Sequence, residues 1–234
     1  MHANILEFLS EARRQGLPSV LVTNTASGEQ VLYIPQYASH GGELSGRQRE
    51  LANNALVTDR CRLVEENGEK FFYHPYNPPL QLIIIGAVHI AQALTLLARH
   101  CGFQVTLVDP RRAFATQQRF PDVSLVTAWP REALAQLNVN TRTAIVTLSH
   151  DPKIDDPALE IALRSPAFYI GSLGSKKTHA ARLQRLAAAG IEPALCARIR
   201  GPVGVSIGAQ SPQEIAVSIM AEIIKVLRVD AVAL

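Results

Sequence analysis

The first 79 residues carry hydrophobic and polar positions with the periods of one helix and two hairpins. Residues 4–15 place apolar side chains at helical spacing and stop at Gly16, which suits a left-handed helix cap. Two pairs of short apolar runs follow, at 19–25 with 30–35 and at 60–66 with 69–74. The second pair flanks Asn67-Gly68, a strong hairpin signal. Three prolines at 75–79 then end the pattern, so we predict a small α+β domain over residues 1–79.

From residue 80 onward, short continuous apolar runs alternate with helical stretches. The apolar runs lie at 81–86, 103–109, 123–128, 143–150 and 167–171. The helical stretches lie at 90–100, 111–119, 130–137, 156–164, 175–189 and 212–228. Runs that are apolar on both faces and separated by helices indicate a parallel sheet covered on both sides. We therefore predict a doubly wound, Rossmann-like α/β domain over residues 80–234, with about five parallel strands.

Charge and cysteine content narrow the classes of function. The formal net charge is only +3, which is too small and too scattered for nucleic acid and suits a single anionic small ligand. The three cysteines are odd in number, far apart and without a C-x-x-C spacing, which is typical of a reduced, cytoplasmic protein. No apolar stretch is long enough for a signal peptide or a bilayer span. The sequence thus predicts neither a membrane nor a nucleic-acid partner.

A glycine-containing turn follows the first strand of the larger domain, where Rossmann folds bind dinucleotides. Gly86 and His89 lie in this turn, and Asp109 ends the next strand at the place of the acidic residue that accepts from a ribose hydroxyl. Val88 replaces the middle glycine of the fingerprint, and its branched side chain weakens NAD(P) binding. The alternative is a turn that merely joins a strand to a helix.

Charged side chains also follow the second and fourth strands. Arg111 is a candidate ligand for an anion, although it also fits a solvated helical turn. His150 and Asp151 stand at the end of the fourth strand and are the candidate ligand-binding residues there. We interpret Asp155 and Asp156, just before a proline, as helix-capping residues.

Two glycine-containing loops complete the candidate site. The loop with Gly171, Gly174, Ser175 and Lys176 opens a helix, so its backbone amides can hold a phosphate, unless it is an ordinary turn capped by Ser175. A second loop, 201–208, precedes the last helix, and its candidate residues are Gly204 and Gly208. On that helix Glu222 is a further candidate, since Glu214 is explained by a capping box with Ser211.

These segments together resemble a known family. The runs 168–176 and 202–222, the pair His150-Asp151, and the segments 109–111 and 119–121 are similar to the XdhC/CoxI family over about residues 85–225. Its members are accessory proteins for the maturation of xanthine dehydrogenase and related molybdenum hydroxylases. The resemblance implies that the chain binds the molybdenum cofactor (molybdopterin), receives its terminal sulfur with help from a cysteine desulfurase, and delivers it to the apo-enzyme.

The chain also departs from the family pattern. Val88 stands where members have glycine, and the N-terminal XdhC/CoxI-like domain is shortened, with 40–43 lacking the cysteine of the family's corresponding stretch. No nucleophile, base and orienting group are visible together, which favours a cofactor-binding chaperone over a catalyst. The alternative is an NAD(P)-dependent oxidoreductase, which rests on the fold alone. We also predict a homodimer, since such proteins commonly close a two-fold interface.

Overall fold

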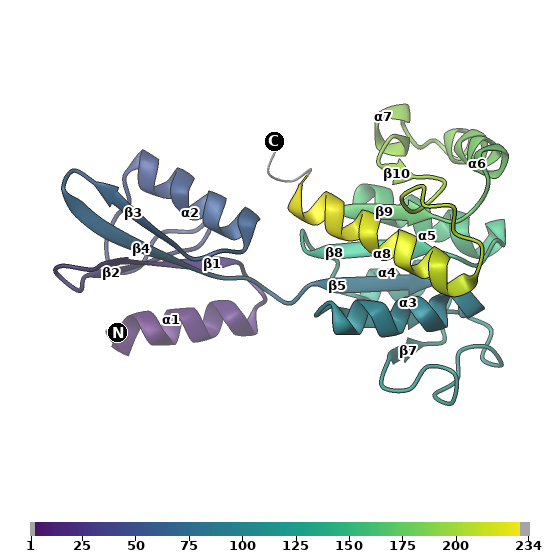
Figure 1. Ribbon diagram of the computed structural model, residues 1–234, viewed down its shortest axis with the longest axis horizontal. Coiled ribbons are helices and arrows are strands. Elements are labelled where there is room, and N and C mark those ends of the chain that lie inside the picture. The colour runs from purple at the N-terminus through teal and green to yellow at the C-terminus, as the bar shows by residue number, and fades with distance from the viewer. Residues whose placement is uncertain (1–2, 230–234) are drawn as a thin grey trace. The chain divides into compact units, whose positions relative to one another are not determined.

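The chain folds into two units (Figure 1). The computed structural model describes residues 3–229, and the first unit ends at Pro78 while the second begins at Pro79. The assignment of these parts as a shortened XdhC/CoxI-like domain and a cofactor-binding domain remains a prediction. Within residues 3–229 no helix has the length and apolar character needed to cross a bilayer.

The first unit is an antiparallel sheet with one helix on each face. The sheet has the order β2-β1-β4-β3, made of β1 (Ser19–Asn24), β2 (Gln30–Tyr33), β3 (Arg62–Glu66) and β4 (Glu69–Tyr76). Helix α1 (Ala3–Arg14) packs Ile5 and Leu9 with Leu21 and Leu32, whereas α2 (Gly46–Thr58) covers the other face with two alanines against Val20 and its neighbours. Alternating strand residues therefore face different helices. The predicted helix and both hairpins are confirmed.

Two features of this unit differ from the sequence prediction. Helix α2 was not predicted, although Ser45 and Gln48 form a complete capping box at its start. Strand β4 continues through Pro75, where we expected the ladder to end. Strand β3 pairs with β4 only as far as Tyr73, so at Pro75 the strand has one neighbour and tolerates a residue without an amide hydrogen.

The second unit is a six-stranded sheet in the order β10-β9-β8-β5-β6-β7, with all neighbouring strands parallel. Its strands are β5 (Gln81–Ile85), β6 (Gln104–Val108), β7 (Ser124–Val126), β8 (Thr143–Thr147), β9 (Tyr169–Ser172) and β10 (Ile199–Arg200). In β5, Leu82 and Ile84 enter one core cluster and Ile83 and Ile85 the other. The sheet is thus buried on both faces, as parallel sheets are, and the Rossmann-like fold is confirmed.

Helices cover both faces of this sheet (Figure 1). On one face α3 (His89–His100) packs against α8 (Pro212–Arg228), and their buried residues share one cluster. The other face carries α4 (Pro130–Gln136), α5 (Pro152–Arg164), α6 (Lys176–Ala188) and the short α7 (Pro193–Cys196). Helix α8 starts at the predicted residue with the predicted capping box of Ser211 and Glu214.

Three local predictions for this unit are wrong. Residues 111–119 form successive turns instead of a helix: the amides of Phe114 and Ala115 bond back to the Arg111 carbonyl, and a second turn begins at Thr116. Helix α5 begins at Pro152 instead of 156, since Asp151 caps it. The sheet has a sixth strand, β10, whose two residues are too few to give a sequence pattern.

The contact between α3 and α8 should dominate the stability of the second unit. Leu94 in α3 is fully buried, whereas Leu96 on the same helix is 50% exposed. Leu94→Ala should lower the free energy of unfolding by about 2–5 kcal/mol because it leaves a cavity. The matched control Leu96→Ala should change it by less than about 0.5 kcal/mol. Urea unfolding measures both, and equal losses would contradict the packing described.

Candidate functional site

The carboxyl ends of four parallel strands bring many of the predicted residues of the second unit to one edge of the sheet, whereas Gly171 lies inside β9 and Gly204, Gly208 and Glu222 lie before or on α8. Strand β5 lies between β6 and β8, so the winding of the chain reverses there. In doubly wound folds, ligands bind outside the carboxyl ends of the strands at such a switch point. Four loops form this edge, at 86–88 after β5, 109–112 after β6, 148–151 after β8 and 173–175 after β9. We call these four loops together the strand-tip edge.

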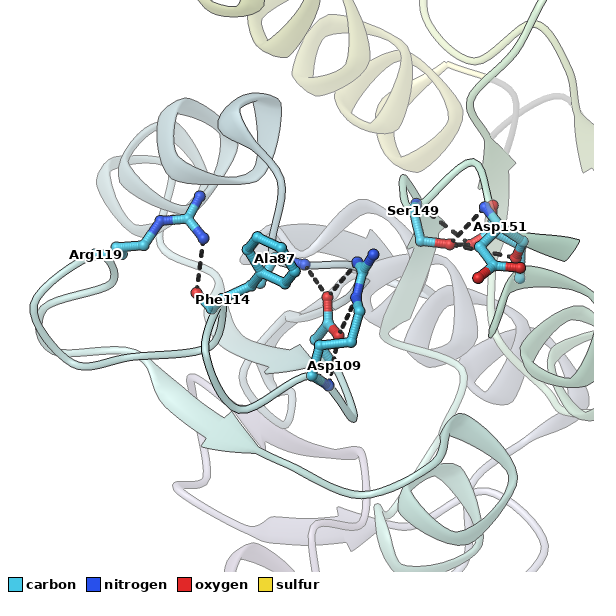
Figure 2. A network of polar contacts seen from close by, with 8 residues as sticks. Ala87, Asp109, Phe114, Arg119, Ser149 and Asp151 are labelled. Atoms are coloured by element: carbon cyan, nitrogen blue, oxygen red, sulfur yellow. Dashed lines mark hydrogen bonds and ion pairs between the residues drawn. The ribbon is translucent and has the colours of Figure 1, made fainter. Parts of the chain in front are cut away.

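Asp109, directly after β6, is fully buried and holds two parts of this edge together (Figure 2). Its Oδ2 accepts from the Ala87 amide and from Arg111 Nη2, both at 2.7 Å, and its Oδ1 accepts from the amide and Nε of Arg111, both at 2.9 Å. Burial alone would raise the pKa of this carboxyl, but the hydrogen bonds from Arg111 and Ala87 outweigh burial and hold the pKa below its ordinary value. Asp109 is therefore ionised at neutral pH.

These bonds limit what Asp109 and Arg111 can offer to a ligand. A carboxylate with no exposed surface and two engaged oxygens must break a bond before it accepts from a ribose hydroxyl. Arg111 is committed only in part, because its Nε and Nη2 are bidentate to Asp109 while its side chain is 36% exposed and keeps further N–H donors. The arrangement favours a positioning role for Asp109 and leaves Arg111 able to meet an anion.

The turn after β5 approaches the loop after β8 closely. Gly86 has a φ of +110°, and a Cβ there would lie 2.8 Å from the backbone nitrogen of Ser149. Only glycine satisfies both conditions. Val88 is the N-cap of α3 without a side-chain hydrogen bond, and the predicted ligand His89 is the exposed first residue of that helix.

The cap of α5 is Asp151 and not Asp155 or Asp156, and Figure 2 shows Asp151 beside Ser149. Asp151, predicted to bind a ligand, caps α5 by accepting from a backbone amide at 2.9 Å. Asp155, predicted to be a cap, is 2% exposed and accepts from Ser149 Oγ at 2.6 Å. Burial raises the pKa of Asp155, and the Ser149 hydrogen bond and the charge of Arg182 offset this only in part.

His150 remains the side chain of this loop that is turned to solvent. It is exposed and has a φ of +62°, a left-handed conformation that histidine adopts more readily than most residues. Backbone strain of this kind gathers at ligand sites, where the surrounding structure maintains it. His150 thus stays the candidate for direct ligand contact at the end of β8.

The predicted phosphate loop opens α6. Gly171 lies within β9, Gly174 in the loop, and Ser175 is the N-cap, with its Oγ accepting from the Thr178 amide at 3.1 Å. The amides at the start of a helix have no partner inside it, and the helix dipole makes this end positive. Lys176 is the exposed first residue of this 13-residue helix. The capping role and the anion role are therefore compatible.

Glu222 holds the glycine loop that precedes α8. Its Oε2 accepts from Tyr169 Oη at 2.5 Å and from the Gly204 amide at 2.9 Å. Burial and this bond to Glu222 raise the pKa of Tyr169. A Cβ on Gly204 would lie 2.3 Å from Ser218 Oγ, so the loop needs glycine there. Gly208 is exposed. A cavity of about 550 Å³ lies beside this contact, lined by residues from and around β9, β10 and α8.

Ser149 and Arg182 were missed by the sequence analysis. Arg182 is 2% exposed and donates from Nη2 to the Leu173 carbonyl at 2.8 Å. Its helix is largely polar and gave no sign of a buried arginine, whereas Ser149 could have been found as the residue before His150-Asp151. Within residues 3–229 no three His, Cys, Asp or Glu side chains gather as a metal site.

Comparisons with known proteins agree on one family. Residues 82–223 match the family described as the XdhC Rossmann domain. The chain is 35% identical over 155 residues to a probable xanthine dehydrogenase subunit of Bacillus subtilis, covering 66% of this chain and 45% of that protein. It is 32% identical over 151 residues to the molybdenum cofactor insertion chaperone PaoD of Escherichia coli, covering 64% and 41%. The alignments thus span less than half of each relative.

A solved structure extends the likeness to almost the whole chain. The crystal structure of a xanthine dehydrogenase from Bacillus halodurans superimposes with a TM-score of 0.70 at 27% identity. The superposition covers 96% of this chain and 64% of that one. Both units therefore have counterparts in one known protein.

The Asp109 network gives a prediction with a defined pH dependence. Asp109→Ala should lower the free energy of unfolding by about 2–4 kcal/mol at pH 7, because the Ala87 amide and Arg111 lose their acceptor. The folded pKa lies below the unfolded value of about 3.9, so this contribution is complete above the unfolded pKa and is lost as pH falls through the folded pKa. Urea unfolding at several pH values should show that the difference in free energy of unfolding between wild type and Asp109→Asn becomes smaller in acid. A difference that stays constant would refute the assignment.

Proposed function

The chain belongs to the XdhC family, and from that premise we propose that it binds the molybdenum cofactor at the strand-tip edge and delivers it to a molybdenum hydroxylase such as xanthine dehydrogenase. The observation that carries the proposal is that the matched residues 82–223 contain the whole strand-tip edge, with its helix-start amides and its buried charges. A relative named as a molybdenum cofactor insertion chaperone supports it.

The residues of the strand-tip edge fit a phosphorylated pterin. The amides at the start of α6 and Lys176 would hold the phosphate, since they combine a positive helix end with a cation. His150 would donate to or accept from the ring, whereas Asp109 would keep the turn at Gly86 in place. Two buried side chains of this region, Asp155 and Arg182, have polar atoms without a partner among the described residues, which suits a site that receives a polar ligand. When bound, the cofactor supplies the molybdenum and sulfur centre that the client enzyme uses.

The geometry favours a carrier over a catalyst. Ser149, the hydroxyl nearest to a buried carboxylate, is bonded to Asp155, and no histidine donates to or accepts from it among residues 3–229. Asp155 is a candidate base for this hydroxyl, but Ser149 is 9% and Asp155 2% exposed, so neither side chain is presented to a substrate. We therefore propose that sulfuration depends on a cysteine desulfurase as partner, in the cytoplasm, and that the carrier acts as a homodimer.

The dinucleotide alternative has less support. The ribose-binding role requires Asp109 to face a ligand, but both of its oxygens are engaged in the protein. Val88 at the N-cap of α3 adds a branched side chain where the fingerprint has glycine. The cofactor-carrier function therefore explains more of the strand-tip edge.

The phosphate assignment is tested by the affinity for molybdopterin. Lys176→Ala should weaken binding by about 1.5–3 kcal/mol, because it removes one charge-assisted hydrogen bond. The matched control is Lys177→Ala, the next exposed lysine, which should change the affinity less than about twofold. Gly174→Val should weaken binding more strongly, since its φ of +144° is strained for a branched residue. Anaerobic titration by fluorescence measures all of them. Full affinity in folded Lys176→Ala and Gly174→Val would exclude the loop as the phosphate site.

Dinucleotide binding provides the test of the alternative. We expect NAD and NADP to bind more weakly than micromolar, because Val88 crowds the pyrophosphate and Asp109 is engaged. Val88→Gly should strengthen binding by less than about tenfold, since it relieves only the first obstacle. Calorimetric titration of wild type and variant measures this. Micromolar or tighter affinity in the wild type would favour the oxidoreductase.

A further inference from the structure

Arg182 is a buried guanidinium whose hydrogen bonds are incomplete. The side chain is 2% exposed, and its Nη2 donates to the Leu173 carbonyl at 2.8 Å. Its Nε and Nη1 have no hydrogen-bond partner in the described part of the chain. Burial lowers the pKa of this guanidinium, while the nearby carboxylates of Asp155 and Asp156 act to raise it. Arginine keeps its charge even so, and an arginine buried this deeply normally has its donors paired.

The same guanidinium lies directly behind the loop that opens α6. Its Nη2 is bonded to the carbonyl of Leu173 and lies 3.7 Å from the position that a Cβ on Gly174 would occupy. The amides that follow this loop are the free donors at the start of α6. A positive helix end and a buried cation therefore meet at one point. This is the combination that holds phosphate groups in proteins.

A carboxyl group that also has a buried atom unpartnered within the described residues lies in the first turn of α5. Asp155 is 2% exposed, and its Oδ1 accepts from Ser149 Oγ at 2.6 Å, whereas its Oδ2 has no partner among residues 3–229. The adjacent Asp156 is already paired, with Arg185 Nε at 2.5 Å, towards solvent. Asp155 is thus a buried carboxyl group close enough to raise the pKa of Arg182, without a hydrogen bond between the two side chains, while burial raises its own pKa.

We propose that Arg182 is the buried cationic wall of a phosphate subsite at 173–176, and that Asp155 competes with the bound phosphate for this guanidinium. The ligand class is a phosphate monoester or a pyrophosphate, because the loop offers amides and a fork of N–H donors that match phosphate oxygens. The subsite adds a residue to the site of the proposed function. It rests on that function only for the identity of the molecule that carries the phosphate. Lys176 forms the outer, exposed side of the subsite and Arg182 the inner one.

The proposed competition predicts a different effect of substitutions on anion binding than a purely structural role of Arg182 and Asp155 does. If Arg182 and Asp155 only supported the fold, a change at either residue would disturb the loop and weaken anion binding. If they compete, removing the charge of Asp155 leaves Arg182 wholly to the phosphate. Asp155→Asn should then bind phosphate more tightly, while its side-chain oxygen can still accept from Ser149.

The experiment is a calorimetric titration of the full chain with inorganic pyrophosphate at fixed ionic strength. Arg182→Met should weaken binding about tenfold or more, and Arg182→Lys should lie between this variant and wild type because it keeps the charge and loses the fork. Asp155→Asn should strengthen binding about threefold or more. The matched control Glu160→Gln removes the same charge from α5 at a surface pair with Arg131, and should change affinity less than about twofold. Thermal unfolding confirms that each variant is folded.

The failures of the two proposals are distinguishable. Wild-type protein that binds molybdopterin but not pyrophosphate at millimolar concentration would overturn the phosphate subsite and leave the carrier function. Unchanged or weaker binding in Asp155→Asn would overturn the competition. If Arg182→Met does not fold, Arg182→Lys decides: wild-type affinity in that variant would refute the fork, and an intermediate affinity supports it.

Discussion

The ionised carboxylate of Asp109 is the interaction on which the rest of the strand-tip edge depends. It is fully buried, so its charge must be satisfied inside the protein, and the Ala87 amide and Arg111 do this with four hydrogen bonds. The bonds fix the turn after β5 against the end of β6. Gly86 then brings the same turn against Ser149, so the loop after β8 is positioned as well. One charge thereby sets the geometry of three loops.

The other side of the strand-tip edge is built differently. Around Asp109 the charged oxygens all have partners, whereas Asp155 and Arg182 each keep a buried polar atom without one among the described residues. A satisfied network is rigid, and an unsatisfied one gains most from a polar ligand. The β5 and β6 side is therefore the scaffold, and the β8 and β9 side is where binding energy is available. This division is the reason why we propose a phosphate ligand at the β8 and β9 side and not a dinucleotide at Asp109.

The sequence predicted what depends on periodicity. Continuous apolar runs require a sheet buried on both faces, and the strands they predicted form that sheet, except for β10, which is too short to have a period. Local competition for hydrogen bonds was not predictable in the same way. Residues 111–119 have helical composition, but two separate turns, closed on the carbonyls of Arg111 and Thr116, replace the helix. Likewise, Pro152 and Pro157 both fit a helix start, and only the folded loop decides that Asp151 is the cap.

The residues of the candidate site could likewise be predicted from the sequence only in part, and the reason is physical. Glycines, histidine and lysine at strand ends were found because their place in the fold follows from topology. Arg182 was missed because its burial arises from the packing of α6 against α5 and α7 and from its bond to the Leu173 carbonyl, which no pattern within α6 records. Its partner Asp155 was interpreted as a cap for the same reason. A buried charge is thus invisible to a prediction that assigns residues one element at a time.

A carrier needs affinity and release in one site, and the proposed competition between phosphate and Asp155 supplies both. In the proposed bound state, the phosphate would accept hydrogen bonds from the Arg182 donors that lack a partner among the described residues. When the phosphate leaves, the guanidinium is not left with an uncompensated charge, because Asp155 remains beside it. The empty site is therefore less costly than an isolated buried arginine would make it, and the affinity is lower by the same amount. A binding protein that only stores its ligand has no use for such a competitor, whereas one that must pass the ligand on does.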